Sequence, residues 1–411
     1  MTFAAPRSKI AAAASGARAA IVALAPIVAP IMTLSRTAAA EPLRLRGDAY
    51  AETRSPVGLV VLHGEDRLKP GVDAETVTWL GTTDAPGPVG DVLTLSVRLR
   101  DVSTGSELRA GRLLVSTGAI RPVHIDGARG LVRMFGGTTV EAFGGFPVAR
   151  RFDYATFDWA TGGRLGQSVG DAFAVGASYL QRRSDGRPAD EEVGADVAFT
   201  PRPWLSGVGR AAFDLTSPGV TDVLASVAAH DADVRGELFT TYRSPGRMLP
   251  STSLFSVLGD FASTNIGATA RWRAYPRLEL VATGSAQMQA SDVGGQGLGR
   301  ATLALDDEWN GTLGVEGRRV EVGASRWSGA RFIASVPMTA VVRVATELEL
   351  VVPDRRRGRP WLWPWALGAV SYRISGAWDV AVGVEASSGP TESATLAGLA
   401  RLSCAFDRMG R

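Results

Sequence analysis

The chain has 411 residues, of which 45% are hydrophobic and 21% charged, and its formal net charge at pH 7 is +3. A single cysteine excludes a disulfide framework. Four of the 44 basic residues and no acid lie within the first 40 positions, which leaves 40 basic against 41 acidic residues beyond them and no basic surface for nucleic acid.

The first 40 residues have the pattern of an export signal. Arg7, Lys9 and Arg18 make the start positive, residues 19–34 are apolar, and three alanines precede Glu41 as a cleavage site. The alternative is a transmembrane anchor, but the apolar run is short and contains two prolines. No run of 18 apolar residues follows, so no helical span is predicted. We predict a signal peptide over 1–40 and one domain over 41–411.

Beyond Glu41 the main signal is alternation of apolar and polar residues, repeated about every 10 to 14 residues and interrupted by Gly, Pro and Asp. Residues 91–101, 265–273, 277–289 and 341–352 are clear examples. The pattern gives roughly 18 to 22 strands, with the weakest evidence before Val148. So many strands are unusual in one sandwich. We therefore predict an all-β fold, a single antiparallel transmembrane β-barrel, with no convincing helix.

The stretch Glu107–Gly145 carries a motif of basic residues and glycines: Leu-Arg-Ala-Gly-Arg at 108–112, Arg121, Asp-Gly-Ala-Arg at 126–129 and Phe-Gly-Gly at 143–145. It resembles porins of the alginate-export and carbohydrate-selective group. The resemblance implies a channel for oligosaccharides or other small hydrophilic solutes, with solute contacts at Arg109, Arg112, Arg121, Asp126 and Arg129. Ordinary cross-strand ion pairs are the alternative role for each of these residues.

Connections after residue 146 alternate between tight turns and longer polar segments. Short periplasmic turns and long outer loops are typical of a transmembrane barrel. The longer segments are 182–190, 244–262, 290–297, 321–328 and 353–360. The loop 244–262 holds an apolar set, so it either folds inward to narrow a pore or serves adhesion.

Charged residues of both signs occupy the polar faces of the strands. In a barrel they line the lumen, where mixed charges solvate water without acting as a single-sign filter. We expect a water-filled pore of weak charge selectivity; the alternative is that the charges cross-link and block a narrow lumen. The candidate pore-lining residues are Arg98, Arg100, Arg109, Arg112, Arg121, Asp126, Arg129, Arg210, Arg271, Arg273, Arg343, Glu347 and Glu349.

Residues for catalysis or metal binding are sparse. The chain has three histidines. His230 is followed by Asp231 and Asp233 in an expected turn, where such residues are common, and His124 lies near Asp126, whose carboxylate can orient an imidazole. The sequence shows neither a His/Cys spacing for a metal nor a convincing nucleophile. We predict that the protein is not an enzyme and uses no cofactor or metal.

Three tryptophans, Trp361, Trp363 and Trp365, share one face at the start of a strand. Aromatic rings are favoured where hydrocarbon meets the headgroups of a bilayer. We expect these three rings to belong to an aromatic girdle. Aromatic packing inside a soluble β-protein is the alternative.

The last strand-like segment, Leu396–Phe406, has one wholly apolar or small face and ends in phenylalanine. It resembles the closing strand of Gram-negative outer-membrane β-barrels, in which a C-terminal Phe acts as the assembly signal. The departure is that residues 407–411 follow the Phe. The resemblance implies recognition of Leu396–Phe406 by the barrel assembly machinery.

The sequence thus predicts an outer-membrane protein of a Gram-negative bacterium, with lipid and a small hydrophilic solute as its partners and no nucleic acid. Passive diffusion of the solute is the expected function. A closed barrel with a surface-binding, adhesion or structural role is the first alternative, and a secreted soluble β-protein the second.

Overall fold

The computed structural model describes residues 43–53, 58–82, 88–148, 158–244, 262–289, 292–323, 325–354, 361–389 and 394–407. The predicted signal peptide, nearly all of the loop 244–262 and most of 353–360 lie outside these ranges.

Strands make up nearly all of the described chain. Alternation of apolar and polar side chains gives each one two different faces. The 22 strands are β1 (Leu43–Glu52), β2 (Gly58–Lys69), β3 (Val72–Thr82), β4 (Pro88–Arg100), β5 (Glu107–Val115), β6 (Val123–Arg133), β7 (Thr138–Pro147), β8 (Trp159–Val169), β9 (Phe173–Ser184), β10 (Arg187–Arg202), β11 (Leu205–Asp214), β12 (Gly219–His230), β13 (Val234–Arg243), β14 (Ser263–Tyr275), β15 (Leu278–Gln289), β16 (Asp292–Ala304), β17 (Thr312–Val322), β18 (Ser325–Pro337), β19 (Val342–Pro353), β20 (Trp363–Arg373), β21 (Trp378–Ser387) and β22 (Thr395–Asp407).

The strands belong to one 22-stranded sheet in which neighbours in sequence pair antiparallel. The first strand also pairs with the last: Gly47 lies opposite Cys404, and Ser403 Oγ donates to Asp48 Oδ1 at 2.6 Å. A sheet whose first and last strands pair has the topology of a barrel. The predicted class is therefore confirmed, at the upper end of the predicted strand number.

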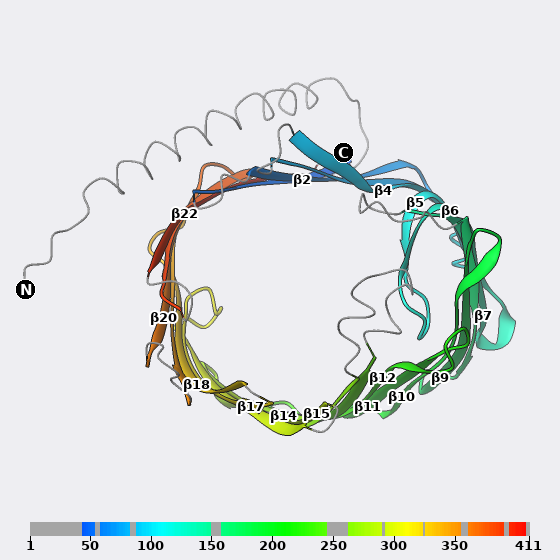
Figure 1. Ribbon diagram of the computed structural model, residues 1–411. Coiled ribbons are helices and arrows are strands. Elements are labelled where there is room, and N and C mark those ends of the chain that lie inside the picture. Colours follow the sequence, from blue (N-terminus) through cyan, green and yellow to red (C-terminus); the bar gives the residue numbers. More distant parts are fainter. Residues whose placement is uncertain are drawn as a thin grey trace, which may run out of the picture. The chain divides into compact units, whose positions relative to one another are not determined.

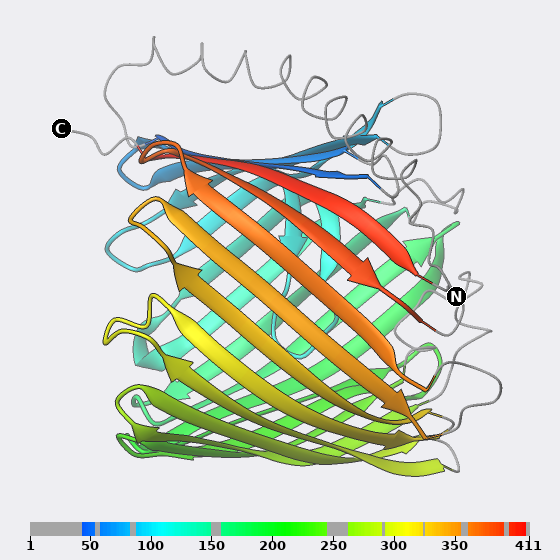
Figure 2. The same ribbon diagram turned by 90° about the vertical axis from the view of Figure 1, so that its left-hand side faces the viewer.

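Two compact units make up the chain. Unit 1 comprises residues 1–93, 302–315 and 329–411, and unit 2 comprises 94–301 and 316–328. In unit 1, β19 to β22 run side by side as long tilted strands (Figure 2). In unit 2, β5 to β15 form a curved sheet with a concave face (Figure 1).

Most turns follow the predicted tight positions, for example between β8 and β9 and between β14 and β15. Three predicted long segments are wrong. The segment 182–190 is a hairpin in which Asp185 and Gly186, with φ of 51° and 70°, join β9 directly to β10. Positive φ at both central residues fits the twist of a two-residue hairpin turn. Strand residues also fill most of 290–297 and 321–328.

Helix is limited, within the described ranges, to one short 3-10 turn at Phe135–Gly137 between β6 and β7. None of the described residues forms a helix long and apolar enough to cross a membrane.

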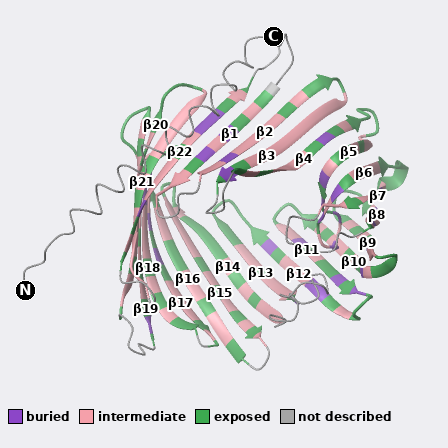
Figure 3. Cartoon of the chain, turned by 45° about the horizontal axis from the view of Figure 1, so that its top comes forward, coloured by how far each residue is buried: buried purple, intermediate pink, exposed green. Residues whose placement is uncertain are grey.

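Buried residues are few, as Figure 3 shows, and many large apolar side chains are exposed. In unit 2 the exposed set shares the convex face and includes Leu95, Leu108, Leu114, Leu165, Leu238 and Ile266. The buried apolar cluster lies among β5 to β9 instead: Leu113, Val115, Ile120, Val123, Ile125, Phe143, Ala160 and Leu180. A water-soluble protein rarely exposes so much contiguous apolar surface. This distribution favours a lipid-facing exterior over the soluble alternative.

Candidate functional site

The concave face of unit 2 carries charges of both signs. Strand register places Asp196 of β10 opposite Arg210 of β11, and Arg243 of β13 opposite Asp222 of β12. Asp222 is shared by Arg210 at 3.2 Å and Arg243 at 3.4 Å. The face is therefore a polar wall with alternating signs, as the strand pattern predicts.

A segment between β5 and β6, residues 116–122, folds back onto this wall rather than extending away from it. Ile120 is 4% exposed and joins the apolar cluster. Burial of such a side chain contributes roughly 1.5 to 3 kcal/mol. The backbone N–H of Ala119 donates to Ser178 Oγ of β9 at 3.3 Å. The segment is thus packed against β9 as part of the wall.

Glycines allow this close approach. Gly118 has φ of +53°, and a Cβ there would lie 2.8 Å from Ser178 Oγ. A Cβ on Gly194 of β10 would lie 2.8 Å from the Ala119 Cβ. Both positions therefore exclude larger side chains for steric reasons, and Gly118 also for its left-handed backbone.

An ion network fixes the same segment. The Arg121 backbone N–H and Nε donate to the two oxygens of Glu192 at 2.8 and 2.7 Å, and Arg121 Nη1 lies 3.0 Å from Asp190. Asp190 also pairs with Arg182 at 2.7 Å. The side chains of Arg121 and Glu192 are 8% and 1% exposed. Desolvated charges persist only when paired and hydrogen-bonded, as these are.

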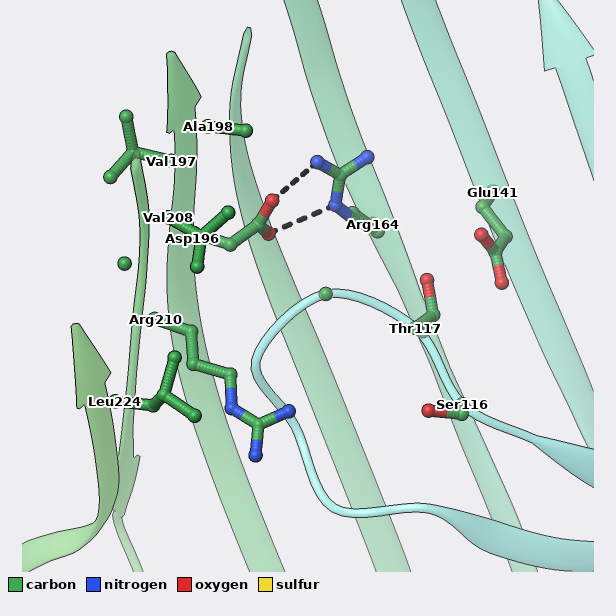
Figure 4. A pocket seen from close by; sticks show the side chains of 12 residues that line it. Ser116, Thr117, Glu141, Arg164, Asp196, Val197, Ala198, Val208, Arg210 and Leu224 are labelled. Atoms are coloured by element: carbon green, nitrogen blue, oxygen red, sulfur yellow. Dashed lines mark hydrogen bonds and ion pairs between the residues drawn. The ribbon is translucent and has the colours of Figure 1, made fainter. Parts of the chain in front are cut away.

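Beside the segment lies a pocket of about 460 Å³. Figure 4 shows Ser116 and Thr117 on its loop side and the strand residues Arg164, Asp196 and Arg210 across from them. Arg164 closes one side by a two-point contact with Asp196, at 2.9 and 2.5 Å. Arg210 is less confined, with 43% of its side chain exposed. The pocket combines charged groups of both signs with apolar side chains and has the size of a small-molecule site.

Eleven of the thirteen predicted pore-lining residues fall into three groups. On the concave face of unit 2 lie Arg98, Arg100, Arg109, Arg129, Arg210, Arg271 and Arg273. Arg121 belongs to the folded-back segment. On the charged face of unit 1 lie Arg343, Glu347 and Glu349.

The strand register places Arg112 and Asp126 away from the face on which the other expected pore-lining residues lie. They face each other across β5 and β6 in a two-point contact of 2.8 and 2.9 Å. Their strand face is that of Leu108 and Leu114, opposite to Arg109. They form a cross-strand ion pair, which is the alternative role considered for them in the sequence.

Two of the three tryptophans do not lie on the apolar strand face, where the rings of an aromatic girdle are expected. Trp365 is opposite Glu349, and its Nε1 donates to Glu385 Oε1 at 2.8 Å. Trp363 has the same strand parity, whereas the exposed Leu348 and Leu350 have the other. The register therefore places Trp363 and Trp365 on the charged face instead of the apolar one; Trp361 precedes β20 and is 60% exposed.

Sequence reasoning missed the buried partners of Arg121. Asp190, Glu192, Gly194 and Asp196 alternate along β10, a period-two signal that the predicted loop over 182–190 obscured. Arg121 contacts Asp190 and Glu192 of this set, and Glu192 lies 71 positions away in sequence, a separation that no local pattern reveals.

Among the described residues no group of three or more His, Cys, Asp or Glu side chains is placed to hold a metal ion. His230 lines a pocket of about 310 Å³ with Arg235, Arg271 and Glu279, near the turn between β12 and β13.

Comparison with known proteins finds likeness in structure alone. No family model matches the chain, and no curated protein matches it. A mutant of the ferric enterobactin receptor PfeA of Pseudomonas aeruginosa, in complex with enterobactin, aligns at TM-score 0.60 and 9% identity, over 90% of this chain and 82% of that chain.

Two further structures align similarly. The copper transporter OprC gives TM-score 0.57 at 10% identity, over 89% of this chain and 80% of that chain. The translocation pore of the P pilus usher PapC gives TM-score 0.50 at 8% identity, over 90% of this chain and 100% of that chain. At such identities the likeness establishes fold, and this chain has the fold of outer-membrane β-barrel proteins.

Proposed function

We propose that the protein is an outer-membrane channel through which small hydrophilic solutes diffuse passively. The observation that carries this proposal is the division of the strand faces: exposed apolar residues gather on one side, and most of the paired charges, of both signs, lie on the other. Lipid matches the first face and water the second.

Closure supports the same assignment. In a hydrocarbon layer every backbone N–H and C=O must find a partner within the protein, and pairing of β1 with β22 satisfies the edge strands. A Gram-negative outer membrane is the location we propose, reached by removal of residues 1–40 and by recognition of Leu396–Phe406 during assembly.

A second function, a closed barrel with a surface-binding or structural role, has one observation in its favour. The segment 116–122 is fixed by buried ion pairs to the concave wall, the face that would line a pore. Because both functions are compatible with the same fold, a measurement of conductance is needed to distinguish them.

The test is single-channel recording. The full chain is expressed in a Gram-negative host, extracted from the outer-membrane fraction in detergent and added to a planar bilayer. Stable nanosiemens-scale steps are expected. A folded, heat-modifiable protein that produces no steps would contradict the channel and favour the closed barrel.

A further inference from the structure

The charged wall beside the segment 116–122 is interrupted by an apolar patch that consists of Ala198, Val208 and Leu224. Ala198 lies opposite Val208 on the neighbouring strand, and Leu224 lies opposite Arg210. Val208 and Arg210 are two positions apart on β11, so the patch shares the concave face with the charges. Val208 is 46% exposed there. A departure of this kind from the polar pattern of a strand face is expected at functional sites.

Arg210 borders the apolar patch and shares its acid with a second arginine. Asp222 lies 3.2 Å from Arg210 and 3.4 Å from Arg243. Asp196 lies directly opposite Arg210, but both of its oxygens accept from Arg164. Two carboxylates thus serve three guanidinium groups. A guanidinium group has five N–H donors, so Arg210 can take a further carboxylate while Arg243 keeps Asp222.

Arg210 and the apolar patch line the same pocket of about 460 Å³. Figure 4 shows the Arg210 side chain extending from its strand toward the loop side, where Ser116 and Thr117 lie. Thr117 is 5% exposed, and its hydroxyl has no hydrogen-bond partner among the residues that the structure describes. Glu141, which also lines the pocket, accepts from Arg129 Nε at 2.7 Å. The pocket therefore combines one accessible guanidinium group with an apolar surface and hydroxyl groups.

We propose that this pocket binds small monocarboxylates that carry a short aliphatic chain. The carboxylate contacts Arg210, whose guanidinium group presents paired N–H donors that match its two oxygens. The chain lies against the apolar patch, and this contact removes apolar surface from water. An acid without a chain leaves the patch in water, and an uncharged chain offers Arg210 no anion, so both bind less tightly. The inference rests on the proposed channel only for a role in permeation, because binding itself does not require conduction.

Binding is measured by titration calorimetry of the detergent-purified protein at low ionic strength, because salt screens exposed charges. Isovalerate is the probe, and a titration into protein-free micelles corrects for its partition into detergent. Two comparison compounds separate the contributions of the two groups. Acetate lacks the aliphatic chain, and isovaleramide has the shape of isovalerate without its charge.

Two variants alter the pocket, and a third is the control. Arg210→Gln removes the guanidinium group, and Val208→Thr replaces one methyl group of the apolar patch by a hydroxyl of similar size. The control is Arg235→Gln. Arg235 lies on the concave face of β13, pairs with Glu237 at 3.6 Å and lines the separate pocket of about 310 Å³.

We expect isovalerate to bind more tightly than acetate or isovaleramide. Arg210→Gln should weaken isovalerate binding about tenfold, the effect of one lost charged hydrogen bond. Val208→Thr should weaken it about fourfold, the effect of one buried methyl group, and should leave acetate binding unchanged. Arg235→Gln should bind isovalerate as the wild type does.

Absence of isovalerate binding, equal binding of isovalerate and either comparison compound, or equal losses in Arg210→Gln and Arg235→Gln would overturn the proposal. If Arg210→Gln loses heat-modifiability, Val208→Thr decides, because it preserves the shape of an exposed side chain. Selective binding without single-channel steps would refute the proposed channel and leave the pocket as a site in a closed barrel. Steps without selective binding would support the channel and refute the site.

Discussion

At the scale of single residues, the strand face on which an arginine lies decides which groups it contacts. Arg109 and Arg112 belong to one short strand and look equivalent in the sequence, yet they lie on opposite faces. Arg109 lies on the concave face of unit 2, and Arg112 pairs with Asp126 beside exposed leucines on the other face. The motif that contains both could be recognised from sequence, but the face of each residue depends on register.

Asp101, in the turn between β4 and β5, illustrates a local pH effect. Its carboxylate accepts hydrogen bonds from the Ser103 hydroxyl at 2.7 Å, the Ser103 N–H at 2.9 Å and the Thr104 hydroxyl at 2.8 Å. The Ser103 hydroxyl contributes most, and together these bonds hold the pKa of Asp101 below its usual value of 3.8. Because the charged form is favoured in the folded turn, the stabilisation is present above pH 3.8 and lost as pH falls through the lowered pKa.

We predict that Ser103→Ala raises the pKa of Asp101 toward 3.8, as removal of the largest contribution requires. The measurement is the side-chain carboxyl 13C shift against pH in detergent micelles. Identical titration midpoints in the variant and the wild type would show that the turn does not hold the carboxylate this way.

At the scale of elements, the hairpin of β9 and β10 shows why boundaries were harder to predict than strands. Polar residues and Pro188 fill 182–190, which made the segment look like a loop. The informative signal was the Asp185–Gly186 pair, whose residue types tolerate the positive φ of a two-residue turn. Once the hairpin is recognised, the acids of β10 fall on one strand face, and two of them, Asp190 and Glu192, contact Arg121.

The second element, segment 116–122, depends on its ion network. We predict that Glu192→Gln destabilises the folded protein by roughly 3 kcal/mol. The substitution removes one of the two carboxylates that balance the charge of the buried Arg121 guanidinium. Urea unfolding in detergent, followed by the gel shift of the folded form, measures the change.

Asp379→Asn supplies the control for that experiment. It breaks the Arg401–Asp379 pair at 3.2 Å, in which both side chains are more than 40% exposed. Such pairs contribute about 0 to 1 kcal/mol. Similar losses in the two variants would mean that the network around Arg121 has no special role.

At the scale of the whole molecule, the fold class and strand number were predictable because period-two alternation persists throughout the chain. The packing of segment 116–122 was not, because Ala119 and Ile120 show no pattern of their own and contact β9 and β10 far along the sequence. The pairing of β1 with β22 is also a long-range contact, although closure itself follows from the need to satisfy strand edges.

A disulfide tests that pairing directly. A Cβ added at Gly47 of β1 would lie 2.9 Å from Cys404 Sγ of β22, close to the Cβ-to-sulfur distance of a disulfide. We predict that Gly47→Cys forms a bond to Cys404 on mild oxidation. The boiled, unreduced protein should then migrate differently from its reduced form on a denaturing gel.

Gly64→Cys, on β2, is the matched control. A Cβ there would meet Thr76 and Leu45 instead of Cys404. A bond in neither variant, or in both, would contradict the specific pairing of Gly47 with Cys404.

The contact between Ser403 and Asp48 joins residues separated by 355 positions. Such contacts form late, since the entropy of closing a long loop must be met before they stabilise anything. Until β22 reaches β1, each of these strands has an edge with unpaired backbone groups, which is where other chains aggregate. Assembly therefore has a vulnerable interval that ends only when the last strand is delivered, so mutations in β22 should reduce the yield of folded protein more than they weaken the finished barrel.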